Sequence, residues 1–148
     1  MKILQNDWLS PFAREVVPNI IQWLPQDLNG NEKTALNILN EWDYIEDKES
    51  AAALVFHTVL DELLHNIYED ELAMIDDKAF DALVHFSMLP YRNIHWVLAE
   101  GQSSWIDDVT TPGYIETRTD IVTKSFSNAV KRIEREVGIN PAVWSWGA

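Results

Sequence analysis

The sequence predicts a compact all-α fold of about five or six helices, built as a single domain over residues 1–148. Apolar residues recur at helical spacing from residue 12 to residue 137, whereas no segment keeps the period-two alternation of a half-buried strand. The chain has only five glycines and six prolines, too few for a turn-dense β architecture. Hydrophobic residues make up 47% of its 148 positions, which is enough for a sizeable core.

The first two helices are expected on either side of a loop over residues 25–30. Ser10 supplies a hydroxyl N-cap and Pro11 takes the first helical position, where its missing N–H costs nothing. Asn31 is expected to cap the second helix. The apolar positions of the two helices are Phe12, Val16, Ile20 and Trp23 or Leu24, followed by Ala35, Leu36, Ile38, Leu39 and Trp42.

The longest helix is expected to begin near Glu49, after a polar break over residues 43–48. Leu60 and Leu64 widen its apolar stripe, which indicates contact from several sides and therefore a central position in the fold. The stripe itself consists of Ala52, Val55, Phe56, Val59, Leu63 and Ile67.

The region after the long helix is expected to hold two shorter helical segments. Asp76-Asp77 is expected to cap a helix that Pro90 ends, because a proline cannot continue a helix. Its apolar positions are Phe80, Leu83, Val84 and Met88. A short turn of helix is then expected over residues 93–99, before a long loop over residues 101–113.

The final helix is expected to begin at a capping box. Thr117 and Asp120 have the required spacing, with Asp in place of the usual Glu. Gly138 followed by Pro141 is a typical helix end. One apolar face is formed by Val122, Phe126, Ala129, Ile133 and Val137.

The chain is strongly acidic, with 24 Asp and Glu against 11 Lys and Arg and a net charge of −13. This balance disfavours nucleic acid and anionic membrane surfaces as partners. There is no cysteine, which excludes thiolate nucleophiles, disulfides and cysteine zinc sites. The sequence contains no run of about 18 apolar residues, so no membrane span is predicted. Residues 1–7 do not contain the apolar region of a signal peptide. We therefore expect either a cytosolic protein or a targeting segment that is not part of this chain.

The charges are unevenly distributed along the sequence. Residues 49–77 contain eight acidic residues and no Lys or Arg. Five of the eleven cations are Arg118, Lys124, Lys131, Arg132 and Arg135. One interpretation makes the acidic long helix and the basic last helix neighbours. The other makes them two separate solvated faces, since surface ion pairs contribute little.

The long helix carries a group of residues that could be taken for metal ligands. His57, Asp61 and His65 lie on one helix face, and Glu62 with His65 has the Glu-x-x-His spacing of di-iron carboxylate bundles. Such a bundle needs a second Glu-x-x-His, whereas the segment 81–85 spaces Asp and His by four. We therefore expect no metal ligand and no cofactor here, and these side chains to lie on the wet flank of the helix or to cap neighbouring loops. A metal-binding helical bundle remains an alternative.

The remaining candidates for catalysis are isolated. His85 and His95 stand among hydrophobic residues and are expected in the core or at its boundary rather than as general bases. Ser103 and Ser104 would need a histidine and an acid to converge on them, and the sequence has no G-x-S-x-G elbow. No glycine-rich phosphate loop is present either. Spacing alone therefore predicts no catalytic residue.

Three stretches form one ordered pattern over nearly the whole chain. The first is Gln5-Asn6-Asp7, followed by Ala13, Val17-Pro18 and Leu24. The second runs from Glu41-Trp42-Asp43 to Ser50-Ala51-Ala52, then Phe56 and Leu60. The third comprises Ser104-Trp105-Ile106-Asp107-Asp108, Thr111-Pro112, Glu116-Thr117-Arg118 and Trp144-Ser145-Trp146-Gly147. Their order and spacing resemble the helical region of the β subunit of the penicillin acylase (penicillin amidase) family, which includes acyl-homoserine-lactone and glutaryl-cephalosporin acylases.

The resemblance implies a parent enzyme of the N-terminal nucleophile (Ntn) hydrolase type. In that family a precursor cleaves itself to expose a serine, whose α-amino group acts as base, and a backbone N–H and an Asn form the oxyanion hole. Those motifs lie upstream of the Gln-x-Asp stretch in the family and are not present in this sequence. Residue 1 is Met, and the Trp-x-Trp-Gly pattern, which in the family runs on toward a His, is followed only by Ala148. We therefore expect an excised or truncated part of a larger acylase, with no family catalytic residue and no calcium ligand.

The function implied is a structural one inside a larger αββα hydrolase, where a helical module would support an apolar acyl pocket. The parent would cleave the amide bond of an acylated amine, such as a penicillin antibiotic or an acyl-homoserine lactone. Its partners would be the α subunit and the rest of the β subunit, in the periplasm or outside the cell. The alternative is an independent acidic helical interaction module with Trp-rich ends. An autocleavage junction encoded upstream would favour the acylase, and a native start at Met1 with a stop after Ala148 would favour the module.

The tryptophans near the two ends distinguish these alternatives. If the chain is an excised segment, we expect Trp8, Trp144 and Trp146 to be partly exposed and the isolated chain to self-associate. The C-terminal tail should then fold back onto its own helices or pack against a second copy, because an exposed Trp is costly in water. An independent module should bury all three in a monomer.

Overall fold

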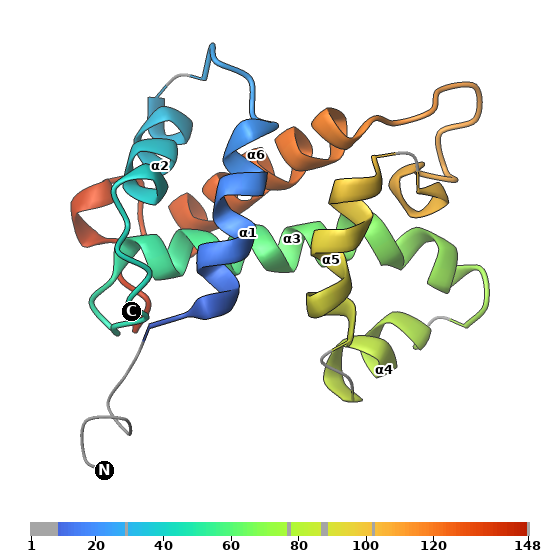
Figure 1. Cartoon of the computed structure of the whole chain (residues 1–148), viewed down its shortest axis with the longest axis horizontal. Helices are drawn as coiled ribbons and strands as arrows, with labels where there is room; N and C mark the ends of the chain where they lie inside the picture. The colour runs from blue at the N-terminus through green and yellow to red at the C-terminus, as the bar shows by residue number, and fades with distance from the viewer. Residues whose placement is uncertain (1–8, 29, 77, 87–88, 102, 148) are drawn as a thin grey trace.

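The computed structural model describes residues 9–28, 30–76, 78–86, 89–101 and 103–147. Over these ranges the chain forms six α-helices and two short 3-10 helices (Figure 1), which confirms the predicted all-α fold. The elements are α1 (Pro11–Gln22), α2 (Gly30–Asn40), α3 (Ala51–Ala73), α4 (Ala79–Phe86), α5 (Leu89–Glu100), η1 (Ser104–Ile106), α6 (Arg118–Glu136) and η2 (Pro141–Val143). The described ranges contain no sheet, and Leu9 and Ile45 form an isolated antiparallel bridge.

Helix α3 is the centre of the fold, as its wide apolar stripe predicts. It crosses the molecule, with α1 and α2 toward one end and α4 and α5 toward the other (Figure 1). Its N-cap is Ser50, whose hydroxyl accepts a hydrogen bond from the Ala53 N–H at 3.1 Å. The buried residues of α3 are Ala52, Ala53, Val55, Phe56, Val59, Leu60, Leu63, Leu64, Ile67 and Tyr68.

Helix α6 packs more extensively against α3 than any other helix does. The predicted capping box is present, because the Thr117 hydroxyl accepts from the Asp120 N–H and the Asp120 carboxylate accepts from the Thr117 N–H. Ser125 is fully buried between the two helices, and its hydroxyl accepts a hydrogen bond from the Asn66 amide at 3.0 Å. The apolar face of α6 therefore completes the core that α3 begins.

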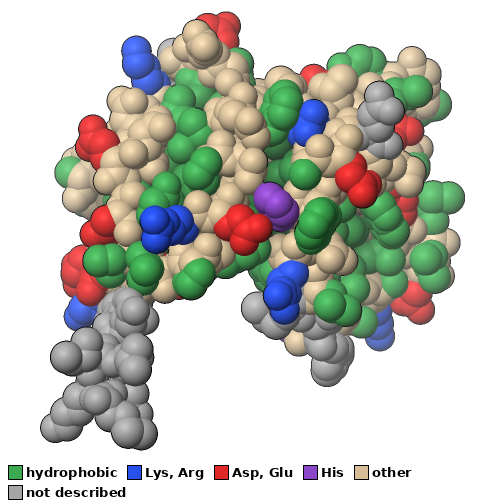
Figure 2. Space-filling model, in the orientation of Figure 1, with side chains coloured by type: hydrophobic (Ala, Val, Ile, Leu, Met, Phe, Trp, Pro, Cys, Tyr) green, Lys and Arg blue, Asp and Glu red, His purple; other side chains and the backbone are tan. Residues whose placement is uncertain are grey.

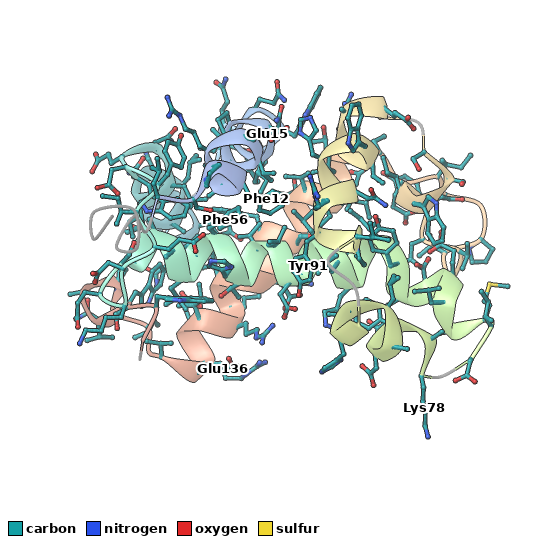
Figure 3. All side chains as sticks on the ribbon, turned by 60° about the horizontal axis from the view of Figure 1, so that its bottom comes forward. Phe12, Glu15, Phe56, Lys78, Tyr91 and Glu136 are labelled. Atoms are coloured by element: carbon teal, nitrogen blue, oxygen red, sulfur yellow. The ribbon has the colours of Figure 1, made fainter. Side chains whose placement is uncertain are left out.

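Helix α1 begins as predicted, and α2 does not. The Ser10 hydroxyl caps α1 by accepting from the Ala13 N–H, and Phe12 meets Phe56 of α3 with ring centroids 6.1 Å apart (Figure 3). The prediction that Asn31 caps α2 is wrong, because α2 already begins at Gly30. The Asn31 amide instead donates to Glu134 Oε1 and the Ile139 carbonyl, at 2.6 and 2.8 Å, and so ties α2 to the end of α6.

The prediction that Pro90 ends a helix is also wrong. Helix α4 ends at Phe86, and Pro90 lies in the first turn of α5, which is longer than the expected turn over 93–99. A proline is tolerated there because the first N–H groups of a helix have no partner inside it. Asp76 lies before α4, which begins at Ala79, and its carboxylate accepts from the Lys78 N–H at 2.7 Å. The other predicted capping residue, Asp77, and Met88 lie outside the described residues.

The C-terminal tail folds back onto the helices of its own chain. Trp144 is 3% exposed, and its indole N–H donates to the Gly138 carbonyl at 2.8 Å. Trp146 remains 43% exposed, and the Gly147 N–H donates to the Lys48 carbonyl at 2.7 Å. One of the two arrangements expected for this tail is thus confirmed. The expected partial exposure holds for Trp146 and is wrong for Trp144, which is part of the core, and Trp8 lies outside the described residues. Of the helices described, none is long and apolar enough to cross a lipid bilayer.

Candidate functional site

The candidate metal ligands of α3 are paired with other side chains rather than with one another. His57 Nε2 lies 3.3 Å from Glu46 Oε1, and His65 Nδ1 lies 3.0 Å from Glu69 Oε2. Asp61, between them along the helix, accepts a hydrogen bond from Arg132. Eight residues of helix span about 12 Å, which is too far for two histidines to share one ion. In the described part of the chain, no three His, Cys, Asp or Glu side chains converge on a position suited to a metal.

His57 is enclosed by the C-terminal tail. The indole of Trp146 stacks on its ring, with centroids 4.2 Å apart and planes inclined by 28°. Burial lowers the pKa of His57 below its usual value of 6.5, and the nearby Glu46 carboxylate partly opposes this effect. The histidine therefore links the start of α3 to the tail, with its ring largely neutral at neutral pH.

Asp61 and Glu62 belong to an ion-pair group between α3 and α6. Arg132 of α6 donates to the Asp61 carboxylate, and its guanidinium also lies 3.5 Å from Glu62 Oε1. The Asp61 carboxylate raises the pKa of Arg132. The acidic long helix and the basic last helix are therefore neighbours, and of the two interpretations of the charge pattern the first is confirmed.

The two isolated histidines have different surroundings. His95 of α5 is half-buried and faces α1, with Nε2 3.6 Å from Glu15 Oε1 and Nδ1 3.4 Å from the Asn19 amide. Its predicted place at the core boundary is confirmed. The same prediction is wrong for His85, which is exposed because it lies on the outer side of α4, opposite the buried Phe80. The His85 ring lies 2.9 Å from the carbonyl of Asp81, one turn earlier.

The serines that were considered as nucleophiles lie at the start of η1. The Ser103 hydroxyl accepts from the Trp105 N–H at 3.4 Å and so acts as the N-cap of this short helix. Ser104 is exposed. Both residues line a groove that sequence reasoning did not identify.

This groove, which we call the α5–η1 groove, encloses a volume of about 670 Å³. Hydrophobic side chains gather on the half of the surface where α4 and α5 lie, with acidic side chains beside them (Figure 2). The lining of the α5–η1 groove consists of Tyr68, Leu72, Leu83, Leu89, Pro90, Asn93, Trp96, Val97, Glu100, Ser103, Ser104 and Trp105. The only sequence signal for this groove was the helical spacing of residues 89, 93, 96 and 100, which places them on one face of α5. The groove itself forms only because η1 and α3 lie opposite that face.

An acidic group lies next to the α5–η1 groove, at the end of α3. Burial is the main cause that raises the pKa of Glu71 from 4.5 to about 8, followed by its hydrogen bond with Asp70 and the charges of Asp70 and Asp107. The Asp70 carboxylate accepts from the Val109 N–H at 2.8 Å, which holds the loop after η1 against α3. Glu71 is therefore largely protonated at neutral pH and adds little negative charge to this end of the molecule.

Arg118 joins the start of α6 to the end of α5 and to Trp23 after α1. The sequence did not indicate this structural role. Its guanidinium donates to the carbonyls of Leu98 and Ala99 at the end of α5, the latter at 3.1 Å. It also lies over the Trp23 ring, 3.7 Å from the centroid. Gly101 leaves room for it, because a Cβ at that position would lie 2.6 Å from the guanidinium. Arg118 thus fixes the end of α5 that borders the α5–η1 groove.

Comparison with known proteins decides the family. The sequence model of penicillin amidase matches residues 1–148, that is, the whole chain. The chain belongs to the penicillin amidase family. This agrees with the resemblance seen in the three ordered stretches, and it places the helical fold and the α5–η1 groove within a family of acylases.

Several relatives of this penicillin amidase family member are acyl-homoserine lactone acylases named QuiP. The protein of Pseudomonas syringae pv. tomato is 28% identical over 145 residues, which cover 97% of this chain and 18% of the relative. That of Pseudomonas aeruginosa is 28% identical over 128 residues, covering 86% and 15%. The chain thus spans less than a fifth of the length of these relatives. No solved structure gives a significant match.

Proposed function

We propose that this chain is a structural helical portion of a penicillin acylase-like amide hydrolase and contributes no catalytic residue itself. The observation that carries the proposal is the family match over residues 1–148, in a chain that spans only 18% of a related acylase. The complete enzyme would be an Ntn hydrolase acting on an acylated amine, such as an acyl-homoserine lactone or a penicillin antibiotic. Its α subunit and the rest of its β subunit would be the partners of this chain.

The arrangement of the titratable side chains supports this proposal. His57, Asp61, His65 and His95 each contact a neighbouring element or a residue one turn away, as described above, and none of them is placed beside Ser103 or Ser104 by a hydrogen bond that the structure describes. An acyl-transfer site needs a nucleophile, a base and an oxyanion site that converge within hydrogen-bond reach. The contacts are those of a packing module, in which polar groups join helices.

The first test is a hydrolysis assay with the isolated chain. We expect no turnover of a long-chain acyl-homoserine lactone, of benzylpenicillin or of a phenylacetyl anilide, because the family's base is the α-amino group of an exposed serine. His95→Ala and Ser103→Ala are the matched variants. Turnover that either substitution removes would place catalysis inside this chain and contradict the proposal.

The second test asks whether the chain can take the place of its counterpart in a longer acylase. The 145 aligned residues of the Pseudomonas syringae pv. tomato relative are replaced by this chain, and self-processing and lactone hydrolysis are measured. We expect both to be retained in part. The control chimera carries Phe126→Asp, which places a charge at a fully buried position and should abolish processing. If the two chimeras show the same self-processing and the same lactone hydrolysis, the structural role is contradicted.

A further inference from the structure

We propose that the α5–η1 groove is the docking site for a cationic amphipathic helix supplied by another part of the acylase polypeptide. The inference rests on the proposed function, because it takes the partner from the remainder of such an enzyme. It goes further by naming the surface that is used and the chemistry of the segment that occupies it.

The groove has the form that helix-in-groove recognition needs. Helix α5 forms one wall over about 18 Å, the rise of its 12 residues, and η1 forms the other. Its floor is apolar and fixed, because Pro90 is buried and Val97 is 9% exposed. An amphipathic helix places side chains at i, i+3, i+4 and i+7 into a groove of this kind.

Two tryptophans provide the apolar anchors of the groove. Trp96 on α5 is 65% exposed and Trp105 on η1 is 38% exposed. Trp105 is held in place by Tyr68 of α3, whose ring it meets edge-on with centroids 5.3 Å apart, and Tyr68 itself is 6% exposed. Tryptophan is the residue most enriched among those that carry binding energy at interfaces. A preformed position also reduces the entropy that binding costs.

The charges around the groove select a cationic occupant. Glu100 is part of its lining, and the end of α3 contributes Asp70, whereas Glu71, whose pKa is raised to about 8, is largely protonated at neutral pH. The segments 67–76 and 89–108, which border the groove, contain seven acidic residues and one cation, Arg92. A second copy of this chain, with a net charge of −13, would bring like charges together, which costs affinity. Lysine or arginine residues flanking an apolar stripe complement this surface.

The source of such a helix follows from the length of the relatives. This chain covers 18% of the Pseudomonas syringae pv. tomato acylase, so more than four-fifths of a polypeptide of that kind lies outside the aligned stretch. That remainder must contact this module if the two form one enzyme. The α5–η1 groove, with two exposed tryptophans in its lining, is a candidate surface for this contact.

The test uses a fluorescent helical peptide of about 15 residues, made of Leu at i, i+3, i+4 and i+7 with Lys elsewhere. A second peptide carries Glu in place of every Lys. Anisotropy titration measures the affinity of each for the wild-type chain and for Trp96→Ala, Trp146→Ala and Glu100→Gln. Trp146 is the matched control, because it is also an exposed tryptophan but lies on His57, eleven residues and about 17 Å along α3 from Tyr68.

We expect the lysine peptide to bind and Trp96→Ala to weaken binding about tenfold or more, whereas Trp146→Ala leaves it unchanged. Glu100→Gln should weaken binding by a smaller factor, and the glutamate peptide should not bind. Because Trp96→Ala alters no charge, general attraction between an acidic protein and a basic peptide would be unaffected by it. Circular dichroism confirms that each variant keeps its helices.

Four results would overturn the proposal. They are no binding of the lysine peptide, equal binding by Trp96→Ala and wild type, equal weakening by Trp146→Ala, and binding of both peptides alike. Sedimentation provides a further check, because a wild-type dimer that Trp96→Ala converts to a monomer would make a second copy the occupant. The peptide result is independent of the chimera experiment, so failure of docking and failure of the acylase role are distinguishable.

Discussion

The contact made by Arg118 allows a sharp prediction about stability. Arg118 is the first residue of α6, yet its guanidinium donates to Leu98 and Ala99 of α5 and lies over Trp23, which follows α1. Substitution by alanine removes these interactions together and leaves the core side chains in place. We therefore expect Arg118→Ala to lower the free energy of unfolding without changing helix content in native buffer.

The size of the effect follows from the surroundings of each partner. Leu98 is 1% exposed, so its carbonyl cannot readily turn to water, and the loss of a charged donor costs about 1.5–3 kcal/mol. Ala99 is exposed, and water can replace its bond. The contact with Trp23 adds about 0.5–1 kcal/mol. Removing a cation from the first turn of α6 stabilises the helix by about 0.3–1 kcal/mol and partly offsets this loss, because the N-terminus of a helix is the positive end of its dipole. The net loss is about 1–4 kcal/mol.

The assay is urea unfolding followed by circular dichroism, compared among wild type, Arg118→Ala, Arg118→Lys and Arg135→Ala. Lysine keeps the charge but lacks the planar guanidinium, so the urea midpoint of Arg118→Lys should lie between those of wild type and Arg118→Ala. Arg135 pairs with the adjacent Glu136 at an exposed site, and its loss should leave the midpoint unchanged. If Arg118→Ala unfolds at the same midpoint as Arg135→Ala, the role assigned to this contact is refuted.

Two further predictions follow from neighbouring features. Gly101→Ala should destabilise by about 1–2 kcal/mol through its positive φ of 70°. Part of the destabilisation should come from the clash between the new Cβ and the Arg118 guanidinium, and this part should shrink when Arg118→Ala is added. A double-mutant cycle in urea measures the coupling energy between the two substitutions. For Glu71, whose pKa is raised to about 8, the folded state binds the proton more tightly than the unfolded chain. Its contribution to stability is therefore complete below pH about 4.5 and is lost as the pH rises to about 8. Urea midpoints should fall more steeply across this window for wild type than for Glu71→Gln, and parallel curves would contradict the assignment.

The sequence predicted the helices where local signals and burial agree. Ser10 and Thr117 were expected to cap helices, and each begins one in the structure, whereas the helix expected from about Glu49 is capped by Ser50. The wide stripe of α3 predicted a central helix because only contact from several sides can bury it. Asn31 and Pro90 were misplaced because each residue type suits more than one position near a helix end. Which of these positions it takes depends on contacts remote in the sequence.

The side-chain surroundings were less accessible from the sequence. The i, i+4, i+8 series of His57, Asp61 and His65 is real on the helix, but Glu46, Arg132 and Glu69 divide it among separate contacts. The helical repeat of α5 marks only one wall of the α5–η1 groove, since the other walls come from segments that tertiary packing brings together. No spacing rule relates Tyr68 to Trp105, although the two rings touch.

The sequence by itself determined the fold class, the central helix, the caps at Ser10 and Thr117 and the acidic character, because these depend on periodicity and composition within short windows. It also carried the ordered stretches by which the chain is recognised as a member of the penicillin amidase family. Only the tertiary structure decided which acidic residues meet Arg132, where Arg118 donates its hydrogen bonds, and that Trp144 is buried while Trp96 remains exposed. The physical reason is that these outcomes depend on which helix faces meet, and that is set by packing the whole core rather than by any single segment.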